Sequence, residues 1–121
     1  MPYKHVVVER PRPDRVDEFT ALGEELMALM IDRGWHLYTA WNAVRGDEGE
    51  PPLFDVGILG RALPPDGALF VFECEFPDLG SLEAQLQAMR NDPEVVKLLL
   101  RGPELIDPAA SRAYILEAWA R

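Results

Sequence analysis

The stretch ALFVFECEF, residues 68–76, alternates between two classes of side chain. In a β-strand, successive side chains point to opposite faces of the sheet. One face of this strand therefore receives a continuous apolar row, Phe70, Phe72, Cys74 and Phe76. The other face receives a mixed row, Leu69, Val71, Glu73 and Glu75. The pattern predicts a sheet that is covered by an apolar layer on one face only.

Three further segments are predicted to be strands of the same sheet. Residues 3–10, YKHVVVER, contain three consecutive valines, which favour extended structure. The aromatic-rich stretch after Gly34 can be read with period two between residues 35 and 42. The stretch SRAYILEAW, residues 111–119, predicts the last strand.

Two helical regions are predicted to supply the covering layer. Apolar residues recur at three- and four-residue steps after Pro13, which suits the first position of a helix. Gly34 is predicted to end this helix as a left-handed cap. A second helix is predicted over residues 79–90, and a further helical segment has Asp92 as its N-cap and Gly102 at its end.

The predicted order is strand, helix, strand, long connection, strand, helix, strand. Two such split units form a ferredoxin-like βαββαβ sandwich, an α+β fold with a four-stranded antiparallel sheet and its helices on one face. The first and third strands are then central neighbours. Residues 45–67, which contain two double prolines and several glycines, are predicted to be a long loop or insertion over a cavity. We interpret residues 1–121 as a single domain, because this length suffices for one core.

The covered face is predicted to carry the phenylalanine row together with Trp35, Leu37 and Trp41. The opposite face is predicted to be too apolar for water and too polar for a dry core, because it receives Tyr3, His5, Val7, Glu9, His36, Tyr38, Asn42, Leu69, Val71, Glu73 and Glu75. Pairing two such faces in a homodimer hides the apolar side chains and encloses a cavity, so a homodimer is predicted.

The most specific group of candidate catalytic side chains consists of His5, His36 and Glu73, because all three are placed on this open face. A histidine beside a carboxylate can abstract a proton from a phenolic or 1,3-dicarbonyl compound. These three residues are therefore the predicted catalytic residues. The alternative is that they hydrogen-bond one another across the dimer interface and perform no chemistry.

Four further side chains on the same face are predicted to bind the ligand, namely Tyr3, Tyr38, Asn42 and Val71. Of these, Tyr38 or Asn42 is predicted to hold the enolate oxygen that proton abstraction creates. Two histidines and a carboxylate are also the ligands of some non-haem iron sites, but their spacing here matches no metal motif. The sequence contains no dinucleotide fingerprint either, so neither a metal nor another cofactor is predicted.

Charge and composition exclude several classes of partner. Twelve lysines and arginines against twenty-one aspartates and glutamates give a net charge of −9. Such a field repels nucleic acid and anionic membrane surfaces. No apolar run approaches the ~20 residues that a membrane helix needs, and the polar N-terminus is unlike a signal peptide. With one cysteine, Cys74, no intramolecular disulfide can form, and a cytoplasmic protein is predicted.

Three stretches resemble the NIPSNAP-like branch of the dimeric α+β barrel superfamily: RPDRVDEF, the segment from Gly34 to Trp41, and NDPEVVKLLL before the final strand. That superfamily also contains cofactor-free monooxygenases, EthD-like proteins and small cyclases. The resemblance implies a homodimer with an interior cavity. This chain has Pro13-Asp14-Arg15 where such proteins usually show Pro-Gly-Lys, and the resemblance carries no pocket chemistry.

Three classes of function are compatible with these features. A cofactor-independent oxygenase, isomerase or cyclase that acts on a small, largely apolar oxygenated molecule explains the polar residues in the cavity. A non-catalytic protein that binds such a molecule explains the same cavity. A structural homodimer explains the apolar rows but assigns no function to the two histidines. The sequence leaves open whether the protein is an enzyme.

Overall fold

The computed structural model describes residues 2–43, 45–46, 61–62 and 69–119. Its four longer strands are β1 (Tyr3–Glu9), β2 (Thr39–Ala43), β5 (Leu69–Phe76) and β6 (Arg112–Glu117). Its α-helices are α1 (Val16–Arg33), α2 (Leu79–Arg90) and α3 (Pro93–Leu99). The short strands β3 (Arg45–Gly46) and β4 (Arg61–Ala62) pair with each other.

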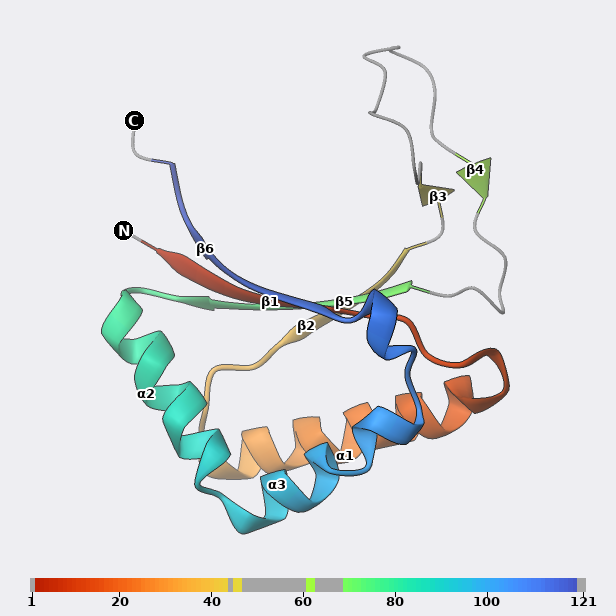
Figure 1. The fold of residues 1–121 in the computed structure, drawn as a ribbon. Coiled ribbons are helices and arrows are strands. Elements are labelled where there is room, and N and C mark those ends of the chain that lie inside the picture. Colours follow the sequence, from red (N-terminus) through yellow and green to blue (C-terminus); the bar gives the residue numbers. More distant parts are fainter. Residues whose placement is uncertain (1, 44, 47–60, 63–68, 120–121) are drawn as a thin grey trace.

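The four longer strands form one antiparallel sheet in the order β2-β5-β1-β6. The first and third of them, β1 and β5, are central neighbours, which confirms the predicted adjacency. All three helices lie on one side of this sheet (Figure 1). The chain therefore has an α+β fold in which the described helices cover one face of the sheet, as the alternation in residues 68–76 predicts. We call the other face, over which none of these helices lies, the open face.

Helix α1 ends as its sequence predicts, whereas its start lies three residues later than predicted, at Val16. Pro13 starts a 3-10 turn, Pro13–Arg15, which leads directly into the α-helix. Gly34 ends the helix with a φ of 70°, a left-handed conformation that favours glycine. Its N–H donates to the carbonyl of Ile31, and the N–H of Trp35 donates to the carbonyl of Met30, both at 3.1 Å. These bonds satisfy carbonyl groups that a helix end leaves free.

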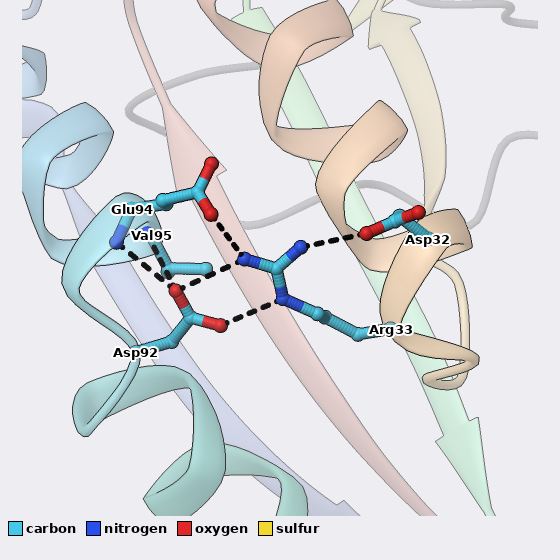
Figure 2. A network of polar contacts seen from close by, with 5 residues as sticks. All are labelled: Asp32, Arg33, Asp92, Glu94 and Val95. Carbon is cyan, nitrogen blue, oxygen red and sulfur yellow. Dashed lines mark hydrogen bonds and ion pairs between the residues drawn. The ribbon is translucent and has the colours of Figure 1, made fainter.

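A charged network joins the end of α1 to the start of α3 (Figure 2). Asp92 is the N-cap of α3, and its carboxylate accepts bonds from the N–H groups of Glu94 and Val95. The same carboxylate accepts a bond of 2.9 Å from Nε of Arg33. Arg33 also donates to Glu94 and to Asp32, each at 2.8 Å. The guanidinium group lowers the pKa of Asp92, and the network holds two helices that are distant in sequence.

The end of α3 differs from the prediction. The α-helix ends at Leu99, and Gly102 instead begins a 3-10 turn, Gly102–Glu104. Gly102 is therefore not the residue that ends the helix.

The core lies between the helices and the covered face of the sheet. Phe70 and Phe72 pack against a cluster that contains Phe19 of α1. Cys74 and Phe76 pack against Leu82 of α2, and all three are almost fully buried. The predicted position of the phenylalanine row under the helices is confirmed.

The register of β1 corrects the predicted faces of this strand. His5 lies opposite Cys74 and Tyr3 lies opposite Phe76. Directly opposite residues of an antiparallel pair share a face. The side chains predicted for the open face, Tyr3, His5, Val7 and Glu9, therefore belong to the covered face, and the prediction is wrong. The prediction failed because β1 contains three consecutive valines, so the two faces of the strand do not differ in polarity along this run.

Strand β2 is shorter than predicted, and its faces are also reversed. It begins at Thr39, and residues 35–38 precede the strand. Trp41 lies opposite Val71 on the open face, where 56% of its surface is exposed. Asn42 lies opposite Phe70 on the covered face, and Tyr38 packs against the core clusters of the helix layer. The prediction that Trp41 is covered and that Tyr38 and Asn42 are open is wrong.

The residues before β2 depart from strand geometry because a side chain holds their backbone. Gln85 of α2 is buried. Its amide oxygen accepts a bond from the N–H of His36, and its amide nitrogen donates to the carbonyl of His36, both at 2.8 Å. Trp35 packs on Met30 and Val95 in the core, as predicted, whereas Leu37 is about half exposed.

Most of the predicted long loop, residues 45–67, lies outside the described residues. Its apolar stretch LFDVGIL and its predicted role over a cavity are not among the features the structure describes. Within the described ranges, no helix is long and apolar enough to cross a membrane.

Candidate functional site

The sheet separates the three predicted catalytic residues. Glu73 lies opposite Val6 and Thr39 on the open face. His5 lies on the covered face, so it is on the other side of the sheet from Glu73. His36 precedes β2 at the same end of the sheet as Glu75 and Lys4. The structure brings His36 and Glu73 together and excludes His5 from them.

His36 and Glu73 line one hollow at the end of the open face. The hollow has a volume of about 230 Å³ and is lined by Lys4, His36, Leu37, Thr39, Glu73 and Glu75. The start of β1, the end of β5 and the residues around the start of β2 supply these side chains. The imidazole ring of His36 also lies 4.9 Å from the ring of Phe76, which supports it from the core side.

The hollow combines both signs of charge. Nζ of Lys4 lies 3.7 Å from a carboxylate oxygen of Glu73, and these side chains are 43% and 34% exposed. An ion pair this open to water is weak and easily exchanged for a bond to a ligand. Glu75 lies directly opposite Lys4. The hollow therefore offers an ammonium group, two carboxylates and an imidazole to whatever enters it.

Lys4, Leu37 and Thr39 are the lining residues that sequence reasoning missed. The prediction placed the odd-numbered residues of the first strand on the open face, and this choice excluded Lys4. The signal that could have found Lys4 is its charge, since a lysine is seldom placed beneath a helix layer.

A second hollow adjoins the first. It has a volume of about 300 Å³ and is lined by Pro2, Lys4, Glu75, Leu116, Glu117 and Ala118. Lys4 and Glu75 line both hollows, one on the β2 side of the sheet and the other on the β6 side.

His5 has a different environment under the helices. Its Nδ1 lies 2.6 Å from Oη of Tyr38, and the two rings meet edge to face. Burial lowers the pKa of His5 and raises the pKa of Tyr38. A neutral imidazole and a protonated phenol follow, so Tyr38 donates and His5 accepts. Burial also raises the pKa of Cys74 to about 11, so the thiol stays protonated.

The predicted ligand-binding residues are likewise divided. Tyr3 donates a 2.8 Å hydrogen bond to Glu117 at the end of β6, and this bond raises the pKa of Tyr3. Tyr3, Tyr38 and Asn42 all belong to the covered side. Of the four predicted residues, Val71 alone shares the open face with the hollow.

Beyond the hollow, the open face is mostly apolar, with Arg112 opposite Val8 as a charged exception. Val6, Val8 and Val71 occupy its centre, with Trp41, Leu69, Tyr114 and Leu116 around them. Tyr114 and Leu116 are 50% and 47% exposed. No helix among the described residues lies over this side of the sheet (Figure 1).

Neither a protein-family model nor a curated protein matches this chain. The likeness to NIPSNAP-like proteins therefore depends on the three stretches of sequence alone. In the part of the chain that the structure describes, no three His, Cys, Asp or Glu side chains gather closely enough to hold a metal ion.

The His5–Tyr38 pair predicts a pH dependence of stability. Burial places the pKa of His5 in the folded protein below its ordinary value of 6.5. The unfolded chain then binds more protons than the folded one as the pH falls below that value, so the free energy of unfolding decreases. We expect His5→Gln to lose less stability than the wild type between about pH 7.5 and about pH 5.5.

Urea denaturation at the two pH values measures this difference. Burial raises the pKa of Glu9, which gives an opposite trend above its ordinary value of 4.5, but Glu9 is present in both proteins and cancels in the comparison. Equal losses of stability in wild type and variant would contradict the assignment of a neutral His5.

Proposed function

We propose that the chain is a NIPSNAP-like protein of the dimeric α+β barrel type, which binds a small, largely apolar oxygenated molecule on its open face. The observation that carries this proposal is the charged hollow at one end of an uncovered apolar sheet face. The strand order β2-β5-β1-β6 and the position of the helices support a ferredoxin-like assignment. The absence of a cofactor and the cytoplasmic location remain predictions from the sequence.

The proposed dimer forms through the open faces of two copies. Burial of apolar surface contributes roughly 25 cal/mol per Å², and Trp41, Tyr114 and Leu116 each leave about half of their surface uncovered in the single chain. An identical face on a second copy is related by a two-fold axis, which is the commonest symmetry of soluble oligomers. The hollow lies at the end of this interface, and the partner chain covers it.

The character of the ligand follows from the neighbours of the hollow. Val71 and Trp41 can hold an apolar body, while the hollow receives a polar end. The ammonium group of Lys4 favours an oxygen that carries negative charge. A small molecule that is apolar at one end and bears a phenolic or carbonyl oxygen at the other fits both regions.

The hollow also contains groups for proton transfer. The imidazole of His36 can take a proton from a carbon or hydroxyl acid, and Glu73 can stabilise the imidazolium ion that forms. Lys4 can then stabilise the enolate oxygen. A non-catalytic binding protein would use the same contacts without turnover, and measured turnover of a bound ligand distinguishes the two.

Trp41→Glu tests the dimer. A carboxylate within an apolar interface is costly to bury, so we expect this variant to have half the mass of the wild type in light scattering. Leu100→Glu is the control, because Leu100 is 72% exposed and follows α3, away from the open face. An unchanged mass for a folded Trp41→Glu protein contradicts the proposed interface.

His36→Ala tests the ligand site. Small phenols and 1,3-dicarbonyl compounds that raise the melting temperature of the wild type should lose that effect on His36→Ala and on Lys4→Ala. His5→Gln is the matched control, because it removes the other histidine, which lies across the sheet. Loss of the effect in His5→Gln, with retention in His36→Ala, would place the site under the helices instead.

A further inference from the structure

Strand β6 presents an apolar outer edge. It is the outermost strand beside β1, and within the described ranges no strand pairs with its other side. All of its residues are exposed, including the consecutive Tyr114, Ile115 and Leu116, of which Ile115 is 52% exposed. Natural edge strands are usually protected by a central charge, a proline or a bulge. Here the charges, Arg112 and Glu117, stand only at the two ends.

The hydrogen bonds between β1 and β6 identify which groups of this edge are unpaired. The N–H of Ala118 donates to the carbonyl of Pro2 at 3.1 Å, and the register places Tyr3 opposite Glu117. Bonded and non-bonded pairs alternate along an antiparallel ladder. The even-numbered residues of β6 therefore bond to β1, and Ala113, Ile115 and Glu117 direct their N–H and C=O groups outward.

We propose that β6 pairs antiparallel with β6 of a second copy, with Ile115 on the two-fold axis. The axis is perpendicular to the sheet, so each face of one sheet continues into the same face of the other. Ile115 then exchanges two backbone bonds with its own counterpart, and Ala113 exchanges two with Glu117 of the second chain. The two four-stranded sheets become one continuous sheet.

The side chains favour this register over its neighbour. With Ile115 on the axis, Tyr114 lies opposite Leu116 on the open face and Ile115 lies opposite itself on the other face. Each exposed apolar side chain is thus paired with another. With Tyr114 on the axis, Leu116 lies opposite Arg112 and Ile115 opposite Ala113, and two large apolar side chains lose an apolar partner of similar size.

The edge pairing is formed by the backbone of β6 and centres on Ile115, which lies on the covered face opposite His5. Tyr114 and Leu116 belong to both surfaces, but the edge pairing does not depend on the proposed function. A protein that uses both interfaces contains four chains, and each interface can be removed without the other. Trp41→Glu addresses the open face, and variants of Ile115 address the edge.

Ile115→Pro and Ile115→Lys test the edge pairing. Proline removes an outward N–H group and no bond to β1, whereas lysine keeps the backbone and places two like charges together at the axis. We expect each variant to halve the mass measured by light scattering, and Leu100→Lys to leave it unchanged. A wild-type mass of 13.6 kDa, or an unchanged mass for a folded Ile115→Lys protein, overturns the proposal.

Ile115→Cys gives a second measurement that does not require the interface to be weakened. The native Cys74 is only 1% exposed, so the introduced thiol is the accessible one. Bonded opposite residues have Cα atoms roughly 5.5 Å apart, a distance that a disulfide can span. Oxidised glutathione should produce a covalent dimer of Ile115→Cys and none of Leu100→Cys. Equal cross-linking of the two variants, or none in either, overturns the proposed register.

Discussion

Replacing Phe76 by alanine is expected to lower the free energy of unfolding by about 3–5 kcal/mol, the usual cost of emptying a buried aromatic site. Phe76 is 1% exposed and ends the phenylalanine row of β5. It packs with Cys74 and Leu82, so its loss opens a cavity between the sheet and α2. The ring of His36 also loses its contact with the ring of Phe76.

Urea denaturation measures this change, and Leu100→Ala is the control. Leu100 is apolar but largely exposed, and such surface changes alter stability by less than about 0.5 kcal/mol. A cost below about 1 kcal/mol for Phe76→Ala would mean that the helices do not pack on this end of β5.

Tyr38→Phe is expected to cost about 1–3 kcal/mol, because it leaves a partly buried acceptor, Nδ1 of His5, without a donor. The ring of Tyr38 remains packed, so the loss reports the hydroxyl group alone. This expectation differs from that of a hydroxyl that faces an open cavity, whose removal costs little. The cost is larger here because the hydroxyl group of Tyr38 makes a 2.6 Å hydrogen bond to Nδ1 of His5.

A double-mutant cycle isolates the pair. Tyr38→Phe, His5→Leu and the double variant are compared by denaturant unfolding at about pH 7.5. We expect the double variant to be more stable than the sum of the single losses implies, because neither partner is then left unpaired. Additive losses would contradict the hydrogen bond.

The local signals in the sequence predicted most of the elements, because each depends on residues close together in the chain. Gly34 ends α1 through its own left-handed backbone, and Asp92 caps α3 through N–H groups two and three residues later. The phenylalanine row of β5 shows which of its faces is covered, because glutamates alternate with it. These interactions need no information from distant parts of the chain.

The candidate site could not be predicted in the same way, because it depends on which face each strand presents. The three valines of β1 fit either face, and the register with β5 alone decides that Lys4 is open and His5 is covered. Before β2, the bonds between Gln85 and the backbone of His36 take the place of strand pairing. No alternation read from Trp35 onward can anticipate this contact, since Gln85 belongs to a helix much later in the sequence.

The central place of β1 has a consequence for the synthesis of the protein. A ribosome makes β1 before the other three strands of its sheet, yet both of its neighbours, β5 and β6, come late in that order. The nascent chain therefore exposes its valines on two unpaired edges, a state that is prone to aggregation. Contacts between such distant segments also form slowly. We expect the sheet to be completed only after β6 has left the ribosome, and translation that stops before β6 should leave β1 as an exposed edge for chaperones to bind.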